Sequence, residues 1–206
     1  MHIPVALKES RHWVLRRGKQ PMNKDGRFTG WNDQSFWMSL EEVLDAWVDN
    51  PESFDGFGFV ISRDETRGDS QIIGGDLDCC RDPITGEISG WAQAVLDSLN
   101  TASSVSISGT GFRFFCLGKL PRGLDNITGF GPQDDLSDTA KANIIRVKES
   151  IKEKLVHDRP TWNGLEIYEN GRHLTVTGEW LKDYPAELEE RTEELSRLVA
   201  LLLEKE

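Results

Sequence analysis

The sequence predicts a mixed α+β fold, because strand-like and helix-like runs follow one another irregularly along its 206 residues. Apolar residues alternate with polar ones in the first kind of run and recur every three or four residues in the second. A doubly wound parallel sheet would need a regular alternation of strands and helices, which this chain does not show. Hydrophobic residues make up 37% and charged residues 29%, which is typical of a folded globular protein.

The first half of the chain predicts most of the strands. Strand-like runs lie at His12–Arg17, Gly56–Ser62, Ser70–Asp78 and, interrupted by two glycines, Ser103–Gly118. Residues 18–30 are rich in Gly, Pro, Asn and Asp, which is typical of a turn. Ser39 and Glu42 form a capping-box pattern that opens a helix of about ten residues. Ile88–Asn100 predicts a second helix, since its apolar residues fall on one face.

The second half predicts two further helices and a hairpin. Residues 134–160 contain a long amphipathic helix. Residues 165–178 predict a β-hairpin around Asn170 and Gly171, a dipeptide typical of two-residue hairpin turns. A last helix is expected from about Pro185 to the end of the sequence.

Charge is unevenly distributed along the chain. The net charge is −11, yet residues 1–30 carry seven Lys and Arg against two acids, whereas residues 183–206 carry eight acids against three cations. A basic N-terminal region suits a protein that holds phosphates, so the net charge does not exclude a nucleic-acid partner.

The cysteine spacing and the hydropathy of the sequence indicate the cellular compartment. Cys79 and Cys80 are adjacent and Cys116 stands alone, so a zinc-ligand spacing is lacking and structural thiols are expected. Apolar runs are too short to span a bilayer, and the N-terminus lacks the apolar core of a signal peptide. We therefore expect a cytoplasmic protein, in a prokaryotic or virus-infected cell, that does not contact a membrane.

Three acids are candidates for a metal site. Asp76 and Asp78 lie two residues apart at a strand end, so their carboxylates should point to the same side. Hard oxygen ligands of this kind select Mg²⁺ or Mn²⁺, although a pair of exposed acids before a turn would give the same pattern. Glu166 lies between Leu165 and Ile167 in an apolar strand, where a buried acid needs a cation, unless the strand lies at a sheet edge and the acid faces water.

A turn of small residues is a candidate phosphate-binding element. Ser108, Gly109, Thr110 and Gly111 separate two strand-like runs, and their backbone N–H groups can approach phosphate oxygens closely. Arg113 follows on the outgoing strand, where an ordinary hairpin with an exposed arginine is the alternative interpretation.

Taken in chain order, these segments resemble the archaeo-eukaryotic primase superfamily, and especially the primase–polymerase domains of phages and plasmids. The matching motifs are GGDLD (Gly74–Asp78), SISGTGFR (Ser106–Arg113) and LEIYENGRHLTVTG (Leu165–Gly178), and the resemblance covers about residues 10–180. It implies a two-lobed fold in which an N-terminal α/β unit packs on an RRM-like unit, with the active site in the cleft between them. Residues 1–180 would form this catalytic domain, and residues 181–206 a helix that leads into a longer parent chain.

The resemblance also implies a function and a site. The function would be template-directed primer or DNA synthesis from nucleoside triphosphates, with template DNA as partner and a helicase module in the parent chain. Asp76, Asp78 and Glu166 would hold the divalent metals. The nucleotide-binding residues would be Ser106, Ser108, Gly109, Gly111, Arg113, Arg172 and Lys19.

Two features depart from the family pattern. Arg113 stands where the family has a histidine that contacts the triphosphate, so either an arginine clamp replaces it or the site is degenerate and kept for binding. Glu166 lies 53 positions after Arg113, and the segment between them includes the long helix, which we expect to be a packed addition with a solvated face rather than a template contact. The rival functions are a non-catalytic nucleic-acid-binding module and a metal-dependent phosphodiesterase or nuclease.

Overall fold

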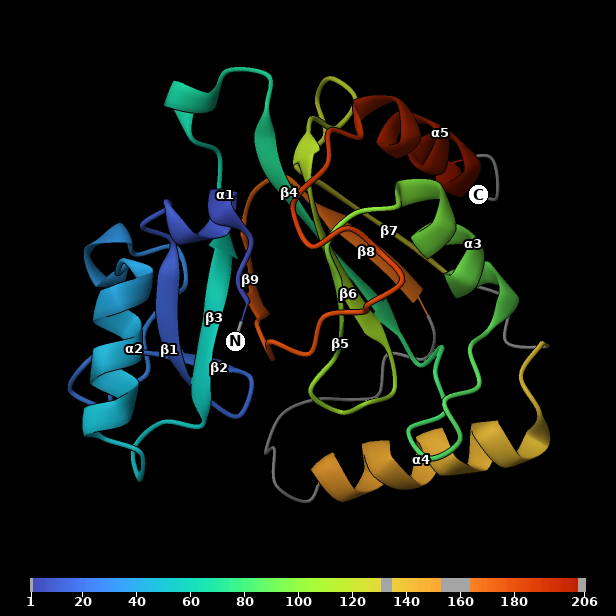
Figure 1. Ribbon diagram of the computed structural model, residues 1–206, viewed down its shortest axis with the longest axis horizontal. Coiled ribbons are helices and arrows are strands. Elements are labelled where there is room, and N and C mark those ends of the chain that lie inside the picture. Colours follow the sequence, from blue (N-terminus) through green and yellow to red (C-terminus); the bar gives the residue numbers. More distant parts are fainter. Residues whose placement is uncertain (1, 131–134, 153–163, 204–206) are drawn as a thin grey trace.

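The computed structural model describes residues 2–130, 135–152 and 164–203, which form two antiparallel sheets with helices around them (Figure 1). The first sheet has the order β2 (Gln20–Met22), β1 (Trp13–Arg17), β3 (Gly56–Ile61) and β9 (Arg172–Thr175). The second has the order β5 (Ser103–Val105), β6 (Phe112–Gly118), β4 (Gln71–Asp78), β8 (Gly164–Tyr168) and β7 (Asn126–Phe130). The predicted α+β class is confirmed.

The α-helices are α1 (Val5–Lys8), α2 (Leu40–Asp49), α3 (Gly90–Leu99), α4 (Asp138–Lys152) and α5 (Thr192–Leu203), with 3₁₀ turns at Gln34–Phe36 and Glu65–Arg67. The predicted capping box at the start of α2 is present, since Ser39 accepts from the Glu42 backbone and Glu42 from that of Ser39. None of the helices in the described ranges is long and apolar enough to cross a membrane.

One core joins the two sheets. Trp13 on β1 and Phe59 on β3 are fully buried and pack with residues of α2. Ile72, Phe115 and Tyr168 of the second sheet belong to the same apolar cluster. Because side chains alternate along a strand, the residues next to these three point to the opposite face, which α3 and α5 cover (Figure 1). The second sheet therefore has one face on the helices and one toward the first sheet.

The predicted hairpin between β8 and β9 is wrong. The chain does bend at Asn170 and Gly171, and Gly171 has a positive φ of 80°. However, β8 pairs with β4 and β7, whereas β9 pairs with β3 of the first sheet. The bend thus passes the chain from one sheet to the other, and Glu166 and Arg172 come from different sheets.

Other boundaries also differ from the sequence prediction. The segment 18–30 contains the short strand β2, and β7 was not predicted. The consecutive strands β3 and β4 belong to different sheets. The last helix begins at Thr192 rather than near Pro185, and residues 153–160 of the segment predicted to contain the long helix lie outside the described residues.

The three cysteines lie inside the protein. Cys79, Cys80 and Cys116 are all buried, and burial raises the pKa of the Cys80 and Cys116 thiols above its usual value. Since thiolates are the reactive form, this environment agrees with structural thiols.

Candidate functional site

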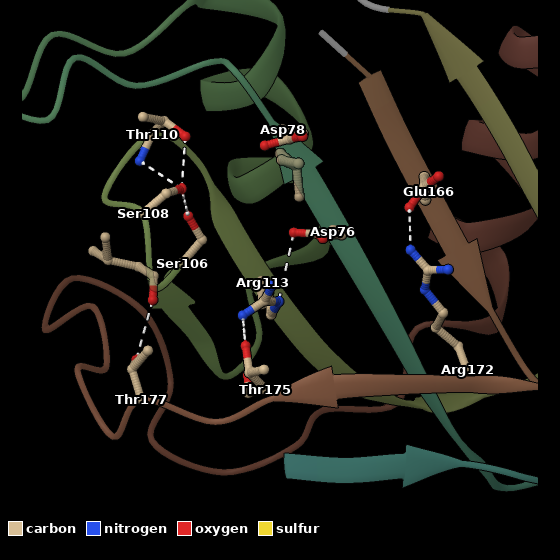
Figure 2. Close-up of polar contacts among 12 residues, drawn as sticks. Asp76, Asp78, Ser106, Ser108, Thr110, Arg113, Glu166, Arg172, Thr175 and Thr177 are labelled. Carbon is tan, nitrogen blue, oxygen red and sulfur yellow. Dashed lines mark hydrogen bonds and ion pairs between the residues drawn. The ribbon is translucent and has the colours of Figure 1, made fainter. Parts of the chain in front are cut away.

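A row of charged residues crosses the middle of the second sheet. Asp76 on β4 lies directly opposite Arg113 on β6 and, on its other side, directly opposite Glu166 on β8. Directly opposed residues of antiparallel strands place their side chains on the same face, so these three share one face (Figure 2). Asp78 lies two residues further along β4 and points the same way. The structure thus brings Asp76, Asp78 and Glu166 to one face of one sheet.

Each of the three acids faces a cation from a different element. The pairs are Arg113 Nε to Asp76 Oδ1 at 3.6 Å, Lys148 Nζ to Asp78 Oδ1 at 2.5 Å, and Arg172 Nη2 to Glu166 Oε2 at 3.2 Å. Carboxylates that share a face repel one another unless cations lie beside them, and here the chain itself supplies those cations.

Because the carboxylates turn toward their cations, they do not converge on one point. Within residues 2–130, 135–152 and 164–203, we find no group of three acidic, histidine or cysteine side chains that lie close enough together to hold a metal ion. The face that the acids share was predicted correctly, whereas a ready-made three-ligand cluster is not present in this part of the chain.

Arg113 links the two sheets. Its Nη1 donates to the backbone oxygen of Thr175 on β9 at 3.2 Å and also to the Thr175 hydroxyl (Figure 2). Arg113 is only 7% exposed, so the guanidinium is fixed between Asp76 and Thr175 rather than free in solvent. The alternative of an exposed arginine on an ordinary hairpin is therefore excluded.

Arg172 and Glu166 form a more open pair. The Arg172 side chain is 45% exposed, and its guanidinium lies over the ring of Tyr168, 5.0 Å from the centroid. Burial and a hydrogen bond to Glu166 raise the pKa of the Tyr168 hydroxyl, which therefore stays protonated. Arg172 has solvent access that Arg113 lacks.

The turn between β5 and β6 presents a chain of hydroxyl groups. Ser106 Oγ lies 3.2 Å from Ser108 Oγ, which lies 2.7 Å from Thr110 Oγ1 (Figure 2). Ser106 and Thr110 are buried, and Ser108 is partly exposed. Such hydroxyls are potential donors to an anion placed beside the row of acids.

This turn is pressed against the end of β4. The carbonyl oxygen of Thr110 accepts from the backbone N–H groups of Cys80 and Arg81 at 3.0 and 3.1 Å. Gly109 has a positive φ of 72°, and a Cβ added to Gly111 would lie 2.0 Å from the Leu77 carbonyl oxygen. Gly109 is therefore required because of its backbone conformation, and Gly111 because the Leu77 carbonyl oxygen leaves no space for a side chain.

Helix α4 contributes a site residue that the sequence analysis missed. Lys148 is 14% exposed in its side chain and contacts Asp78, so the expectation of a purely solvated charged face on α4 is wrong at this position. Burial alone would lower the pKa of Lys148, but the Asp78 carboxylate raises it overall. The spacing in the sequence could have indicated this contact, because Lys148 lies on the same helix face as Ala140 and Ile144, at intervals of four residues.

Further cations surround Arg113 at the junction of the sheets. Arg16 on β1 has a lowered pKa because of burial, and Arg113 adds to that effect. Burial and the charges of Arg113, Arg16 and Arg172 lower the pKa of His173 to about 3. Lys19 lies exposed between β1 and β2, and no hydrogen bond or ion pair described in the structure joins it to the acids.

Comparison with known proteins finds a distant relative. No protein-family model matches the chain. The chain is 27% identical over 186 residues to the DNA primase-polymerase of Nitratiruptor phage NrS-1. The match covers 87% of this chain but 21% of that protein, so the chain spans about a fifth of the length of its relative.

Proposed function

We propose that this chain is a nucleotidyltransferase domain of the primase–polymerase type, which synthesises primers or DNA on a template from nucleoside triphosphates. The observation that carries the proposal is the row formed by Arg113, Asp76 and Glu166, with Asp78 beside it on the same face. The distant relative, whose name is DNA primase-polymerase, supports the same reaction class.

The donor set fits a hard divalent cation. Asp76, Asp78 and Glu166 offer carboxylate oxygens only, the ligand type that Mg²⁺ and Mn²⁺ prefer. When bound, such an ion would supply charge stabilisation for an in-line displacement at phosphorus. The carboxylates would hold it by rotating away from Arg113, Lys148 and Arg172.

Charge balance supports joint binding of metal and nucleotide. The three acids and their three cations are neutral as a group. A divalent cation alone leaves positive charge in excess, and a triphosphate alone leaves negative charge in excess, whereas each of the two offsets part of the charge that the other brings. We therefore expect each ligand to raise the affinity for the other.

The phosphate-binding groups lie beside the acids. Arg113 pairs with Asp76 and Arg172 with Glu166, and arginine can bind phosphate oxygens with two parallel hydrogen bonds. The hydroxyls of Ser106 and Ser108 and the turn through Gly109 and Gly111 add neutral donors. Lys19 is the most remote candidate. With all three acids intact, we favour a working arginine clamp over a degenerate site.

The two sheets would correspond to the two lobes of the proposed fold. The first sheet with α2 would be the N-terminal unit, and the second sheet with α3 and α5 the RRM-like unit. Template DNA would lie along the cleft between the lobes. A helicase module in a longer parent chain belongs to the same proposal, since the chain spans only part of its relative.

One gel assay tests the function. Labelled template, with and without a primer, is incubated with Mg²⁺ or Mn²⁺ and with ribo- or deoxynucleoside triphosphates, or with neither nucleotide. Extension that needs both metal and nucleotide is expected. Degradation without nucleotide would instead identify a nuclease, and binding without any product would identify a non-catalytic module.

Matched variants make the assay specific to the site. Asp76→Asn and Glu166→Gln should each abolish extension, because each removes a metal ligand. Glu193→Gln is the control, since Glu193 lies on α5 with a side chain that is 81% exposed. Equal loss in all three variants would contradict the assignment of the acids.

A further inference from the structure

Lys148 contacts the acids from α4, which lies outside the three sequence motifs that resemble the primase superfamily. Its Nζ lies 2.5 Å from Asp78 Oδ1, although the two residues are 70 positions apart in the chain. Figure 1 shows α4 running across one end of the second sheet. The contact is thus a product of the fold and not of local sequence.

Helix α4 is held in place by contacts before Lys148. Asn143 donates to both carboxylate oxygens of Asp82, at 3.2 and 3.0 Å. Ala140 and Ile144 pack on Cys79, the residue after Asp78. These contacts fix the first turns of the helix, so the stem of Lys148 starts from a defined position beside the acids.

The backbone at Cys79 adds a second fixed point. Cys79 has a φ of 55°, which is uncommon for a residue other than glycine. Such conformations persist only where the surroundings enforce them, and they turn the chain sharply at the end of β4. Asp78 is thereby kept at the end of the strand, within reach of α4.

A lysine side chain can move from one ionic partner to another more easily than a fixed arginine. Its ammonium group is a compact charge on a flexible four-carbon stem, whereas Arg113 is fixed by two bonds to Thr175. The Lys148 side chain retains some exposure, 14%, so it can turn outward without leaving an apolar core.

We propose that Lys148 is a phosphate-binding residue that pairs with Asp78 in the metal-free site and moves to the triphosphate when metal and nucleotide bind. This inference rests on the function proposed above. The ammonium competes with a divalent cation for Asp78 and, once displaced, lies beside the negative charge of the nucleotide. Metal binding to the nucleotide-free protein is therefore opposed by Lys148, and nucleotide binding is favoured by it.

Two binding measurements on one set of variants test this role. Mn²⁺ binding to the nucleotide-free protein is followed by the EPR signal of free Mn²⁺, and binding of a non-hydrolysable nucleoside triphosphate in saturating Mn²⁺ by calorimetry. Lys148→Met keeps most of the stem but removes the charge, and Lys148→Arg keeps the charge. Arg146→Met is the control, because Arg146 is an exposed cation on the same helix.

Opposite shifts are expected in Lys148→Met. Its affinity for the nucleotide should fall by about ten-fold or more, the effect of one lost charge-assisted hydrogen bond. Its affinity for Mn²⁺ alone should rise by about three-fold or more, because a competing cation is gone. Lys148→Arg keeps the charge and should therefore lie closer to the wild type than Lys148→Met in both measurements, and Arg146→Met should match the wild type. Circular dichroism of each variant checks that it is folded.

The outcomes separate this inference from the proposed function. A wild-type protein that binds neither Mn²⁺ nor the nucleotide overturns the function, and the role of Lys148 with it. A wild-type protein that binds both, with Lys148→Met unchanged in either measurement, overturns only the role of Lys148.

Discussion

Asp76 on β4 lies directly opposite Glu166 on β8, so two acids share adjacent positions on one face of the second sheet. Like charges in such positions destabilise a sheet unless cations compensate them. Arg113 on β6 pairs with Asp76, Arg172 from the first sheet pairs with Glu166, and these two cations provide that compensation. The two ion pairs differ in burial, and the difference leads to a prediction.

Asp76→Asn should destabilise the protein more than Glu166→Gln. The partner of Asp76 is Arg113, whose side chain is 8% exposed, and removing the carboxylate leaves a nearly buried guanidinium without its counter-charge. We expect a loss of about 1–3 kcal/mol in the free energy of unfolding. The partner of Glu166 is 45% exposed, so its loss should cost less than about 1 kcal/mol. Urea denaturation measures both, and equal losses would contradict the difference in burial.

Thr175→Val should weaken nucleotide binding without removing any charge. Thr175 is buried and receives two hydrogen bonds from Arg113 across the sheets, one of them to its hydroxyl. Valine keeps the shape but not that hydroxyl, so Arg113 loses one of the contacts that orient it. We expect an effect of about 1 kcal/mol on nucleotide affinity.

Arg113→Ala sets the upper limit for that effect. It should weaken nucleotide binding by about 1.5–3 kcal/mol, and Arg113→Lys should recover only part of this, since a point charge cannot reproduce the fork of donors. Calorimetric titration with a triphosphate in Mn²⁺ compares all three variants. If Thr175→Val weakens binding as much as Arg113→Ala, the threonine acts on the nucleotide by itself.

Local patterns predicted much of the fold and the face that Asp76 and Asp78 share. The capping box of Ser39 and Glu42 and the alternation around Asp76 are encoded within a few residues, and both were predicted correctly. The shared face of Asp76 and Asp78 follows from strand periodicity alone. Strand β7 was missed because its sequence, Asn-Ile-Thr-Gly-Phe, contains a glycine and few apolar residues.

Long-range pairing was the part that local patterns did not predict. The chain does bend at Asn170 and Gly171, but the local sequence does not decide whether the strands on the two sides of the bend pair with each other. Their partners, β3 and β4, lie about a hundred residues earlier in the chain. The contact of Lys148 with Asp78 is also a long-range contact. It was missed because Lys148 is one of several charged residues on an amphipathic helix, whose charged face was expected to be solvated.

Protonation of His173 should make the protein less stable in acid. The pKa of His173 is lowered to about 3 by burial and by Arg113, Arg16 and Arg172, against an ordinary value of 6.5 in the unfolded chain. Below pH 6.5 the unfolded state therefore binds a proton that the folded state does not, so stability is lost as the pH falls from about 6.5 toward 3. The slope from this residue is at most about 1.4 kcal/mol per pH unit.

His173→Gln isolates this contribution, because glutamine stays neutral throughout the range. Urea denaturation at several pH values between 7 and 4 should give a shallower decline for the variant than for the wild type. His2→Gln is the control, since the His2 side chain is 45% exposed and its ring contacts Glu187 at the surface. Parallel declines for wild type and His173→Gln would show that His173 is protonated in the folded state.

Gly111→Ala should disrupt both the fold and the site. A Cβ at this position would lie 2.0 Å from the Leu77 carbonyl oxygen and 3.2 Å from the Asp78 Cα, and both are backbone atoms that cannot rotate away. The turn would have to move off the end of β4, which we expect to cost about 2 kcal/mol or more. Nucleotide affinity should fall as well, because Ser108 moves with the turn.

Gly123→Ala is the matched control: Gly123 has a φ of 91° but nothing within 4 Å of the added Cβ, so only backbone strain of about 1 kcal/mol applies. Denaturation and nucleotide titration of both variants should show a larger loss of stability in Gly111→Ala, and a loss of affinity in that variant alone. Equal stability of the two would mean that the turn tolerates displacement and that its contact with β4 does not order the site.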